Sequence, residues 1–208
     1  MLRNDNDTTK LFDEWAKSYD DDLLQASGPL YGYNESLHAV QNILSVTAND
    51  TLLDIGIGTG TFASLISDKN STVHGVDISN KMLEECKHKH PTYELKQGTF
   101  LNTRQHNSFF NYVITSFAFH EVYPQKRLTA LQEIHRVLKS GGKLLLLDIM
   151  FPSSAAREDG KKQIGHYWDD SEDYPIGSEL DTQLRKAGFH NIVWKHTAPF
   201  HWAVKAEK

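Results

Sequence analysis

The chain has 208 residues, of which 39% are hydrophobic and 24% are charged. This composition is typical of a globular protein and argues against intrinsic disorder. The formal net charge of −5 is unfavourable for binding nucleic acid and favours a small-molecule partner. The longest aliphatic run, Leu144 to Leu147, is too short to span a membrane. Because the N-terminus lacks the apolar stretch of a signal peptide and Cys86 is the single cysteine, we expect a cytoplasmic protein without an intrachain disulfide.

The first part of the chain is predicted to be helical. Residues 1–10 are polar and are expected to be frayed. An amphipathic helix over 11–26 is predicted from four apolar residues at helical spacing, Leu11, Trp15, Tyr19 and Leu23. A loop over 27–33 separates it from a second helix over 34–46, which has Asn34 as its expected N-cap.

From Thr51 onward, predicted strands and helices alternate. Strands are expected over 51–55, 72–76, 93–96, 110–116 and 143–149. The helices between them are expected over 60–68, 79–89 and 124–139, the last ending in a glycine cap at Gly141. This alternation predicts βαβ units and a parallel, doubly wound sheet with helices on both faces.

The last quarter of the chain departs from this alternation. Residues 150–175 are polar and aromatic and are predicted to form an irregular insertion or lid. A helix follows over 178–187, with Ser178 at its start and Gly188 at its end, and two further strands are predicted over 190–196 and 200–205.

A glycine-rich turn follows the first predicted strand and opens a helix. Gly56 permits the tight turn, Gly58 lets backbone approach a ligand, and Gly60 allows close packing of the helix start. Asp77 lies at the end of the next strand, about 20 residues further on, where a carboxylate can accept hydrogen bonds from both hydroxyls of a ribose. This combination predicts a nucleotide site.

A second acid, Asp54, lies at the mouth of the turn. A carboxylate there would repel the pyrophosphate of a dinucleotide and would favour a cationic ligand, such as an α-amino group or a sulfonium. Thr61 also stands where the third glycine of the dinucleotide fingerprint would be. These residues favour S-adenosylmethionine over NAD.

Six segments resemble the ordered motifs of the class I S-adenosylmethionine-dependent methyltransferases, in particular the small bacterial enzymes of the methyltransferase-domain type. They are, in chain order, FDEWAKSYD, LLDIGIGTG, VHGVDIS, YELKQGTFLN, FNYVITSFAFHEV and LQEIHRVLKSGGKLLLLD. The resemblance implies a seven-stranded, mostly parallel Rossmann-like sheet whose final strand is antiparallel. It also implies one domain over 1–208, with an N-terminal cap over 11–46 and a lid over 150–175.

The resemblance also implies methyl transfer from S-adenosyl-L-methionine to a small-molecule acceptor by direct displacement. By position in the motifs, Asp54 would hold the methionine end, Asp77 the ribose hydroxyls, and Thr99 would stand where the family often has an adenine-reading Asp. The full set of implied cofactor contacts is Tyr19, Asp54, Gly56, Gly58, Thr59, Gly60, Asp77, Ile78, Met82, Thr99, Phe100, Ser116 and Phe117.

His120 is the candidate catalytic residue, because it follows the fourth strand, at whose carboxyl end ligands bind in such sheets. It is either a general base or a histidine that holds its loop in shape. The candidate acceptor pocket consists of aromatic and histidine residues from two loops, Tyr31, Tyr33, His166, Tyr167 and Trp168. The alternative for these residues is local packing.

Two other functions remain open from the residues alone. A non-catalytic S-adenosylmethionine-binding or regulatory protein would show the same cofactor motifs. An NAD(P)-dependent oxidoreductase would be expected to carry a Tyr-x-x-x-Lys pair, which Tyr19 and Tyr123 do not form. We expect no metal site, since His88 and His90 lie at a polar helix end without nearby acids or cysteines.

Overall fold

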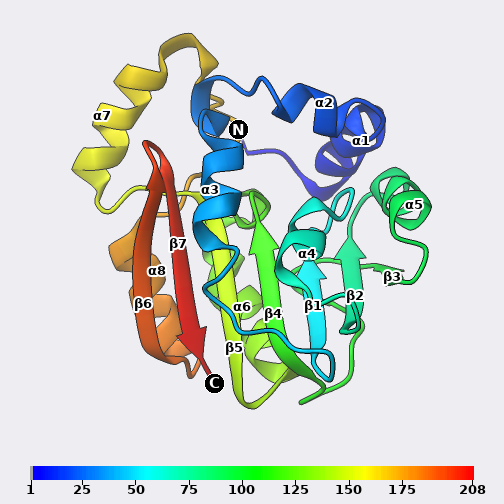
Figure 1. Ribbon diagram of the computed structural model, residues 1–208. Helices are drawn as coiled ribbons and strands as arrows, with labels where there is room; N and C mark the ends of the chain where they lie inside the picture. Colours follow the sequence, from blue (N-terminus) through cyan, green and yellow to red (C-terminus); the bar gives the residue numbers. More distant parts are fainter. Residues whose placement is uncertain (1) are drawn as a thin grey trace.

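The computed structural model describes residues 2–208, and within them seven strands form one sheet in the order β3-β2-β1-β4-β5-β7-β6 (Figure 1). The strands are β1 (Thr51–Ile55), β2 (Thr72–Asp77), β3 (Glu94–Gln97), β4 (Phe110–Ser116), β5 (Leu138–Ile149), β6 (His190–Ala198) and β7 (His201–Glu207). The first five strands are parallel, whereas β7 is antiparallel to both β5 and β6. The predicted doubly wound, mostly parallel seven-stranded sheet is therefore confirmed.

Helices cover both faces of this sheet (Figure 1). The α-helices are α1 (Asp5–Trp15), α2 (Tyr19–Leu23), α3 (Tyr33–Val40), α4 (Thr61–Ile66), α5 (Asn80–Lys89), α6 (Arg127–Val137), α7 (Ser154–Ile164) and α8 (Gly177–Lys186). Short 3₁₀ turns are η1 (Gly28–Leu30), η2 (Phe119–Glu121), η3 (Pro124–Lys126) and η4 (Gly165–Tyr167). α3, α4 and α5 pack on one face and α6 and α8 on the other.

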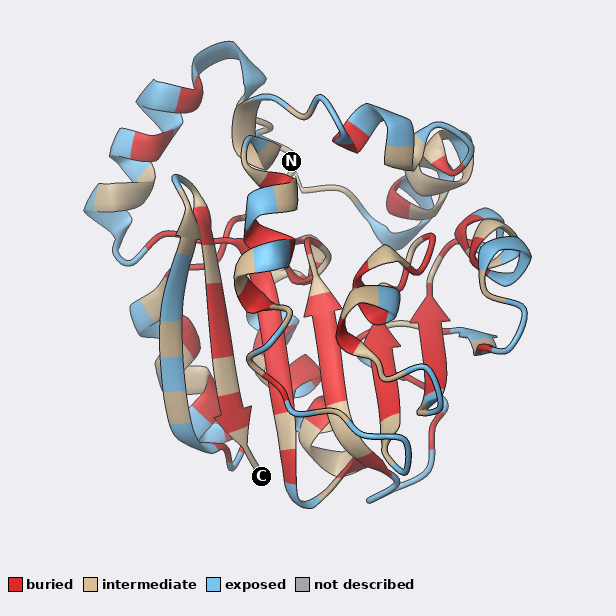
Figure 2. Ribbon diagram, viewed as in Figure 1, coloured by how far each residue is buried: buried red, intermediate tan, exposed pale blue. Residues whose placement is uncertain are grey.

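The aliphatic run in β5 supplies both cores. Leu145 and Leu147 belong to the apolar cluster on the α3 and α4 side, whereas Leu144 and Leu146 belong to the cluster on the α6 and α8 side. Successive residues of a strand point to opposite faces of the sheet. A strand that is covered on both faces is therefore apolar at every position. Figure 2 shows the central strands as buried over most of their length.

Several predicted boundaries at the N-terminus are wrong. Residues 1–10 are not wholly frayed, because the Asn4 side chain accepts hydrogen bonds from the backbone N–H groups of Asn6 and Asp7 and caps α1. The single helix predicted over 11–26 is broken into α1 and α2. The next helix, α3, begins at Tyr33 after Gly32, which has a φ of 90°, instead of being capped by Asn34.

Two later predictions also need correction. Gly141 does not cap the helix before β5: α6 ends at Val137, and Leu138 enters the sheet directly because it pairs with Phe110. The segment 150–175 is only partly irregular, since it contains α7 and η4. Within the described residues, no helix has both the length and the apolar character needed to cross a membrane.

Candidate active site

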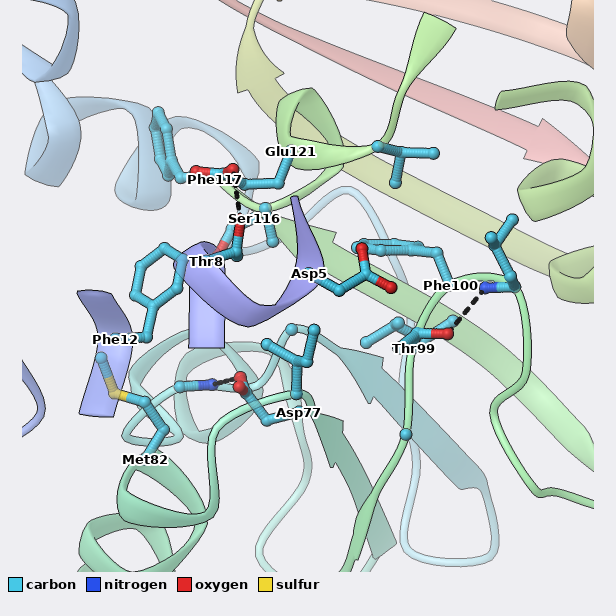
Figure 3. A pocket seen from close by; sticks show the side chains of 18 of the residues that line it. Asp5, Thr8, Phe12, Asp77, Met82, Thr99, Phe100, Ser116, Phe117 and Glu121 are labelled. Carbon is cyan, nitrogen blue, oxygen red and sulfur yellow. Dashed lines mark hydrogen bonds between the residues drawn. The ribbon is translucent and has the colours of Figure 1, made fainter. Parts of the chain in front are cut away.

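A cavity of about 890 Å³, its open mouth included, lies at the carboxyl ends of β1, β2 and β4. Its floor is the turn after β1, its sides come from the segments after β2, β3 and β4, and α1 crosses above it (Figure 3). The predicted cofactor residues that line it are Tyr19, Gly56, Gly58, Asp77, Ile78, Met82, Thr99, Phe100, Ser116 and Phe117.

The glycine turn has the conformation that its sequence predicts. Gly56 and Gly58 have φ angles of 73° and 53°, in the left-handed region that favours glycine. A Cβ atom at Gly56 would lie 2.5 Å from the Cβ of Ala118, whereas the nearest atom to a Cβ at Gly58 is 3.9 Å away, on Tyr19. The backbone at Gly58 therefore borders open space in the cavity, and a side chain there would occupy part of it.

Asp77 is buried but reaches the cavity. Its Oδ2 accepts the backbone N–H of Gly58 at 2.9 Å (Figure 3), and its Oδ1 accepts that of Ser79 at 2.8 Å. Burial raises the pKa of Asp77 to about 6, although these N–H groups act in the opposite direction. Each oxygen keeps a further lone pair, so the group fits the predicted task of accepting ribose hydroxyls.

Asp54 lies below the cavity wall rather than on it. The residue is only 1% exposed, and its Oδ1 atom has no hydrogen-bond partner among the described residues. Burial, reinforced by the nearby Asp77, raises the pKa of Asp54 well above its usual value. An unpaired buried carboxylate beside a glycine turn is suited to a cationic ligand group, such as the amino group of the expected cofactor.

Two other predicted cofactor contacts are also set back from the cavity. Thr59 is buried, and its Oγ1 donates to Asp20 Oδ1 at 2.6 Å. Gly60 precedes α4 with a φ of 92°, and a Cβ there would meet His90 and Cys86. Both residues shape the turn.

At the opposite side of the cavity, Ile78, Met82, Thr99 and Phe100 provide a mainly apolar wall. Thr99 Oγ1 accepts the backbone N–H of Leu101 at 3.3 Å (Figure 3). Phe100 packs edge-on against Phe119, with ring centroids 5.4 Å apart. These contacts make the wall a rigid slot of the kind that suits a flat ring.

Sequence reasoning expected an N-terminal cap over 11–46 but did not select the residues with which α1 lines the cavity. Asp5, Thr8 and Phe12 line the cavity from above. α1 is attached to α5 because Asp13 Oδ1 accepts hydrogen bonds from the Ser79 hydroxyl at 2.5 Å and from the Lys81 N–H at 3.2 Å. The signal was present in the capping residue Asn4 and the acidic first turn that follows it.

His120 lies one layer behind the cavity. Its Nδ1 is 2.6 Å from Asp148 Oδ1, and its backbone N–H donates to Asp148 Oδ2 at 2.9 Å. Burial alone would lower the pKa of His120, but the charge and hydrogen bond of Asp148 outweigh it and raise the pKa to about 10. The neighbouring Glu121, which the sequence analysis did not select, lines the cavity instead.

The five predicted acceptor-pocket residues do not line this cavity. Tyr33 is buried and packs against Phe117, with ring centroids 4.8 Å apart. Trp168 packs edge-on against Tyr174 in the segment between α7 and α8. The other three residues, Tyr31, His166 and Tyr167, are exposed. The structure therefore brings only Tyr33 next to a cavity residue.

Comparisons with known proteins identify the family of this chain. Residues 52–142 match the family model described as a methyltransferase domain. An uncharacterized methyltransferase of Staphylococcus carnosus is 30% identical over 181 residues, which cover 84% of this chain and 81% of that protein. The chain belongs to the class I S-adenosylmethionine-dependent methyltransferases. This membership excludes the oxidoreductase alternative.

Two further matches cover nearly the whole length of this methyltransferase. An uncharacterized methyltransferase of Oceanobacillus iheyensis is 27% identical over 209 residues, covering 95% of this chain and 96% of that protein. A solved Thermotoga maritima protein is described as a S-adenosylmethionine-dependent methyltransferase and possible histamine N-methyltransferase. It is similar with a TM-score of 0.73 and 22% identity, covering 96% of this chain and 99% of its own. This structural likeness supports the fold.

Proposed function

We propose that this methyltransferase transfers the methyl group of S-adenosylmethionine to a small-molecule acceptor. The observation that carries the proposal is one cavity that joins the glycine turn, Asp77 and the end of β4 beneath α1. The acidic net charge of −5 favours a metabolite over a nucleic acid.

The cofactor would lie between the apolar wall, Asp77 and the glycine turn. Ile78, Met82, Thr99 and Phe100 would contact the adenine. Asp77 would accept hydrogen bonds from the ribose hydroxyls, and the turn at Gly56 and Gly58, with Asp54 below it, would hold the methionine end. The presence of an unpaired oxygen on Asp54 supports this orientation, because the methionine end carries positive charge.

The acceptor would then enter beside Ser116, Phe117 and Glu121, at the end of β4. When bound, S-adenosylmethionine supplies a methyl group on a sulfonium leaving group, so the protein mainly has to align the acceptor and exclude water. Thr8 and Phe12 of α1 cover this side, and we propose that the N-terminal helices act as the cap of the site.

For His120, the contacts support positioning of Glu121 and its loop. A histidine whose pKa is about 10 is protonated at neutral pH and therefore has no free lone pair with which to accept a proton. A general base, where the acceptor needs one, would have to come from the cavity wall or from the acceptor itself.

The direct test is transfer of a labelled methyl group from S-adenosylmethionine to a panel of amines, thiols, phenols and carboxylates. Asp77→Asn should reduce both cofactor affinity and turnover, while Asp159→Asn, at an exposed position on α7, should change neither. Binding of the cofactor without transfer to any panel member, together with transfer to a macromolecule from the same cells, would contradict a small-molecule acceptor.

A further inference from the structure

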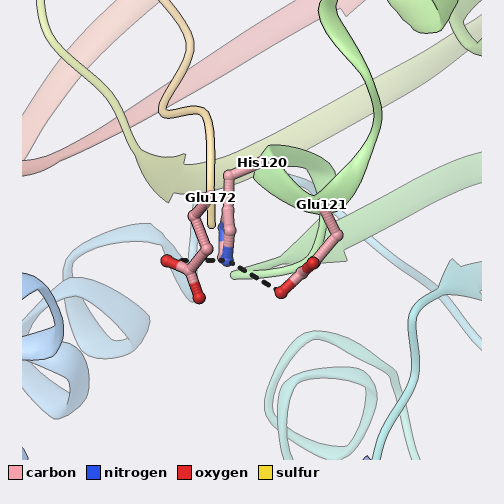
Figure 4. A group of neighbouring side chains, drawn as sticks. All are labelled: His120, Glu121 and Glu172. Carbon is pink, nitrogen blue, oxygen red and sulfur yellow. Dashed lines mark ion pairs between the residues drawn. The ribbon is translucent and has the colours of Figure 1, made fainter. Parts of the chain in front are cut away.

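A second cluster of polar side chains lies beside the cavity, between η2 and the segment that joins α7 to α8. It consists of His120, Glu121 and Glu172 (Figure 4). His120 Nε2 is 3.8 Å from Glu121 Oε1 and 3.9 Å from Glu172 Oε2, and one ligand atom from each residue lies within 4.8 Å of the others. Segments about 50 residues apart in sequence are thus brought to one point.

The orientation of His120 is fixed from behind. Asp148, which is fully buried at the end of β5, binds Nδ1 at 2.6 Å, and this leaves Nε2 directed toward the two glutamates. The side chain of His120 is 94% buried, yet its Nε2 atom makes no hydrogen bond to any described residue. A carboxylate behind a histidine is the usual arrangement around metal-binding imidazoles, because it sets the tautomer and increases ligand basicity.

Arg3 supplies the positive charge at this point in the structure. One of its amino groups, Nη2, is 2.5 Å from both Glu121 Oε1 and Glu172 Oε1, and Nη1 is 2.9 Å from Asp169. Arg3 comes from the segment that leads into α1, whereas the histidine and the glutamates belong to the body of the domain. The positive charge and the three side chains that it contacts or neighbours therefore come from different segments of the chain.

We propose that His120, Glu121 and Glu172 form a binding site for a divalent transition-metal ion, which takes the place of the Arg3 guanidinium. One imidazole and two carboxylates are ligands that zinc and similar ions accept, and three protein ligands leave a position open. Bonds of about 2.0–2.2 Å in a tetrahedral site place ligand atoms roughly 3.4 Å apart. The separations of 3.8 to 4.8 Å need only a small rotation of the two glutamates.

Metal binding would exchange the positive charge of the Arg3 guanidinium for that of the metal ion. The metal ion forms bonds to Nε2 and to one oxygen of each glutamate, the Nε2 proton leaves to solvent, and the guanidinium moves away from the carboxylates. A small opening bordered by Arg3, His120, Glu121 and Ser171 connects the cluster to the surface and gives the ion a route of entry. Because Glu121 also lines the cavity, the ion would lie at the wall where the acceptor is expected.

The test uses the full-length protein after removal of metal with a chelator, titrated calorimetrically with Zn²⁺ and, in separate runs, with Mg²⁺. We expect one equivalent of Zn²⁺ to bind, and no measurable binding of Mg²⁺, which prefers an all-oxygen site. Glu172→Gln should weaken Zn²⁺ binding at least tenfold, and Arg3→Gln should strengthen it severalfold by removing the competing cation. Circular dichroism and a melting curve establish that each variant is folded.

Two histidine variants provide the controls. His166→Ala and His88→Ala remove exposed imidazoles outside the cluster and should leave Zn²⁺ affinity unchanged. Zn²⁺ binding that Glu172→Gln leaves intact, or that either control abolishes, would overturn the proposed site. Unchanged affinity in Arg3→Gln would overturn the replacement of Arg3. None of these measurements depends on the methyl acceptor, so failure here is distinguishable from failure of the proposed function.

Discussion

Protonation of Asp77 between pH 7 and pH 5 is expected to change the stability of the protein and its affinity for the cofactor in opposite directions. Burial raises the pKa of this carboxyl to about 6 in the folded protein, against an ordinary value of 3.8. The folded state therefore takes up a proton at a higher pH than the unfolded state does. Stability associated with this group increases as the pH falls through 6 and decreases as the pH rises. Cofactor binding should change in the other direction, because a protonated carboxyl is a poorer acceptor for two ribose hydroxyls.

Both effects can be given an order of magnitude. At pH 5 the group is about nine-tenths protonated in the folded state, which adds on the order of 1 kcal/mol to the free energy of unfolding relative to pH 7. The gain approaches about 3 kcal/mol once the pH is below 3.8. Since only about a tenth of the folded protein is then competent at pH 5, the apparent cofactor affinity should fall roughly tenfold.

Comparison with Asp77→Asn isolates these effects from those of other titrating groups. Urea unfolding of the two ligand-free proteins at pH 7 and pH 5 should show the wild type gaining on the order of 1 kcal/mol relative to the variant. Calorimetry with S-adenosylhomocysteine should show a pH-dependent affinity for the wild type and a weaker one, with much less pH dependence, for the variant. A stability difference that is the same at both pH values, or a wild-type affinity that does not fall, would refute the role given to this carboxylate.

Three further predictions concern the turn, the loop and the cap. Gly56→Ala should destabilise the protein by clearly more than Gly141→Ala. Both glycines have left-handed φ angles, but only a Cβ at Gly56 meets another atom, at 2.5 Å. Urea unfolding of the two variants tests this, and equal losses of unfolding free energy would contradict it. His120→Ala should cost about 3–5 kcal/mol by leaving the buried Asp148 without its partner. Because we propose that His120 positions Glu121 and its loop, the variant should also lower turnover more than cofactor affinity. A loss of stability below about 1 kcal/mol would argue against the pairing. Phe12→Ala should weaken cofactor binding with little change in melting temperature, since Phe12 lines the cavity but is only half-buried. Calorimetric titration with the cofactor measures this, and an unchanged affinity would contradict a capping role for α1.

The parts of the structure that depend on local sequence were predictable. The strand at 51–55, the glycine turn and the strand at 72–77 follow one another in a short stretch, and each has its own signal in hydrophobic pattern or glycine spacing. The same holds for β4, whose predicted bounds of 110–116 are those of the structure. Asp77 could be assigned to the cavity because the ends of adjacent parallel strands lie at one edge of the sheet.

Features that depend on contacts between distant segments were not predictable. The first half of α1, up to residue 10, looked like a polar, frayed terminus, and the position of α1 above the cavity depends on Asp13 binding Ser79, more than 60 residues away. The exposed aromatic residues of 165–168 looked like a pocket wall, but nothing in their own sequence indicates which way the loop turns. The cluster of His120 and Glu172 likewise exists only because the α7–α8 segment folds back over η2.

The two ends of the cavity hold their negative charge differently. Asp54 and Asp77 are buried and, among the described residues, have no ion-pair partner, whereas Glu121 is paired with Arg3. Buried carboxylates without a counter-ion reduce the stability of the ligand-free protein. A ligand that brings positive charge to the glycine turn offsets this cost, and its binding stabilises the fold by an amount that grows with the logarithm of its concentration over its Kd. At the other end Glu121 already has Arg3 as a counter-ion, so a second cation beside Glu121 would compete with Arg3. The charge distribution therefore favours entry of a cationic cofactor at the glycine turn and leaves the end beside Glu121 for the acceptor.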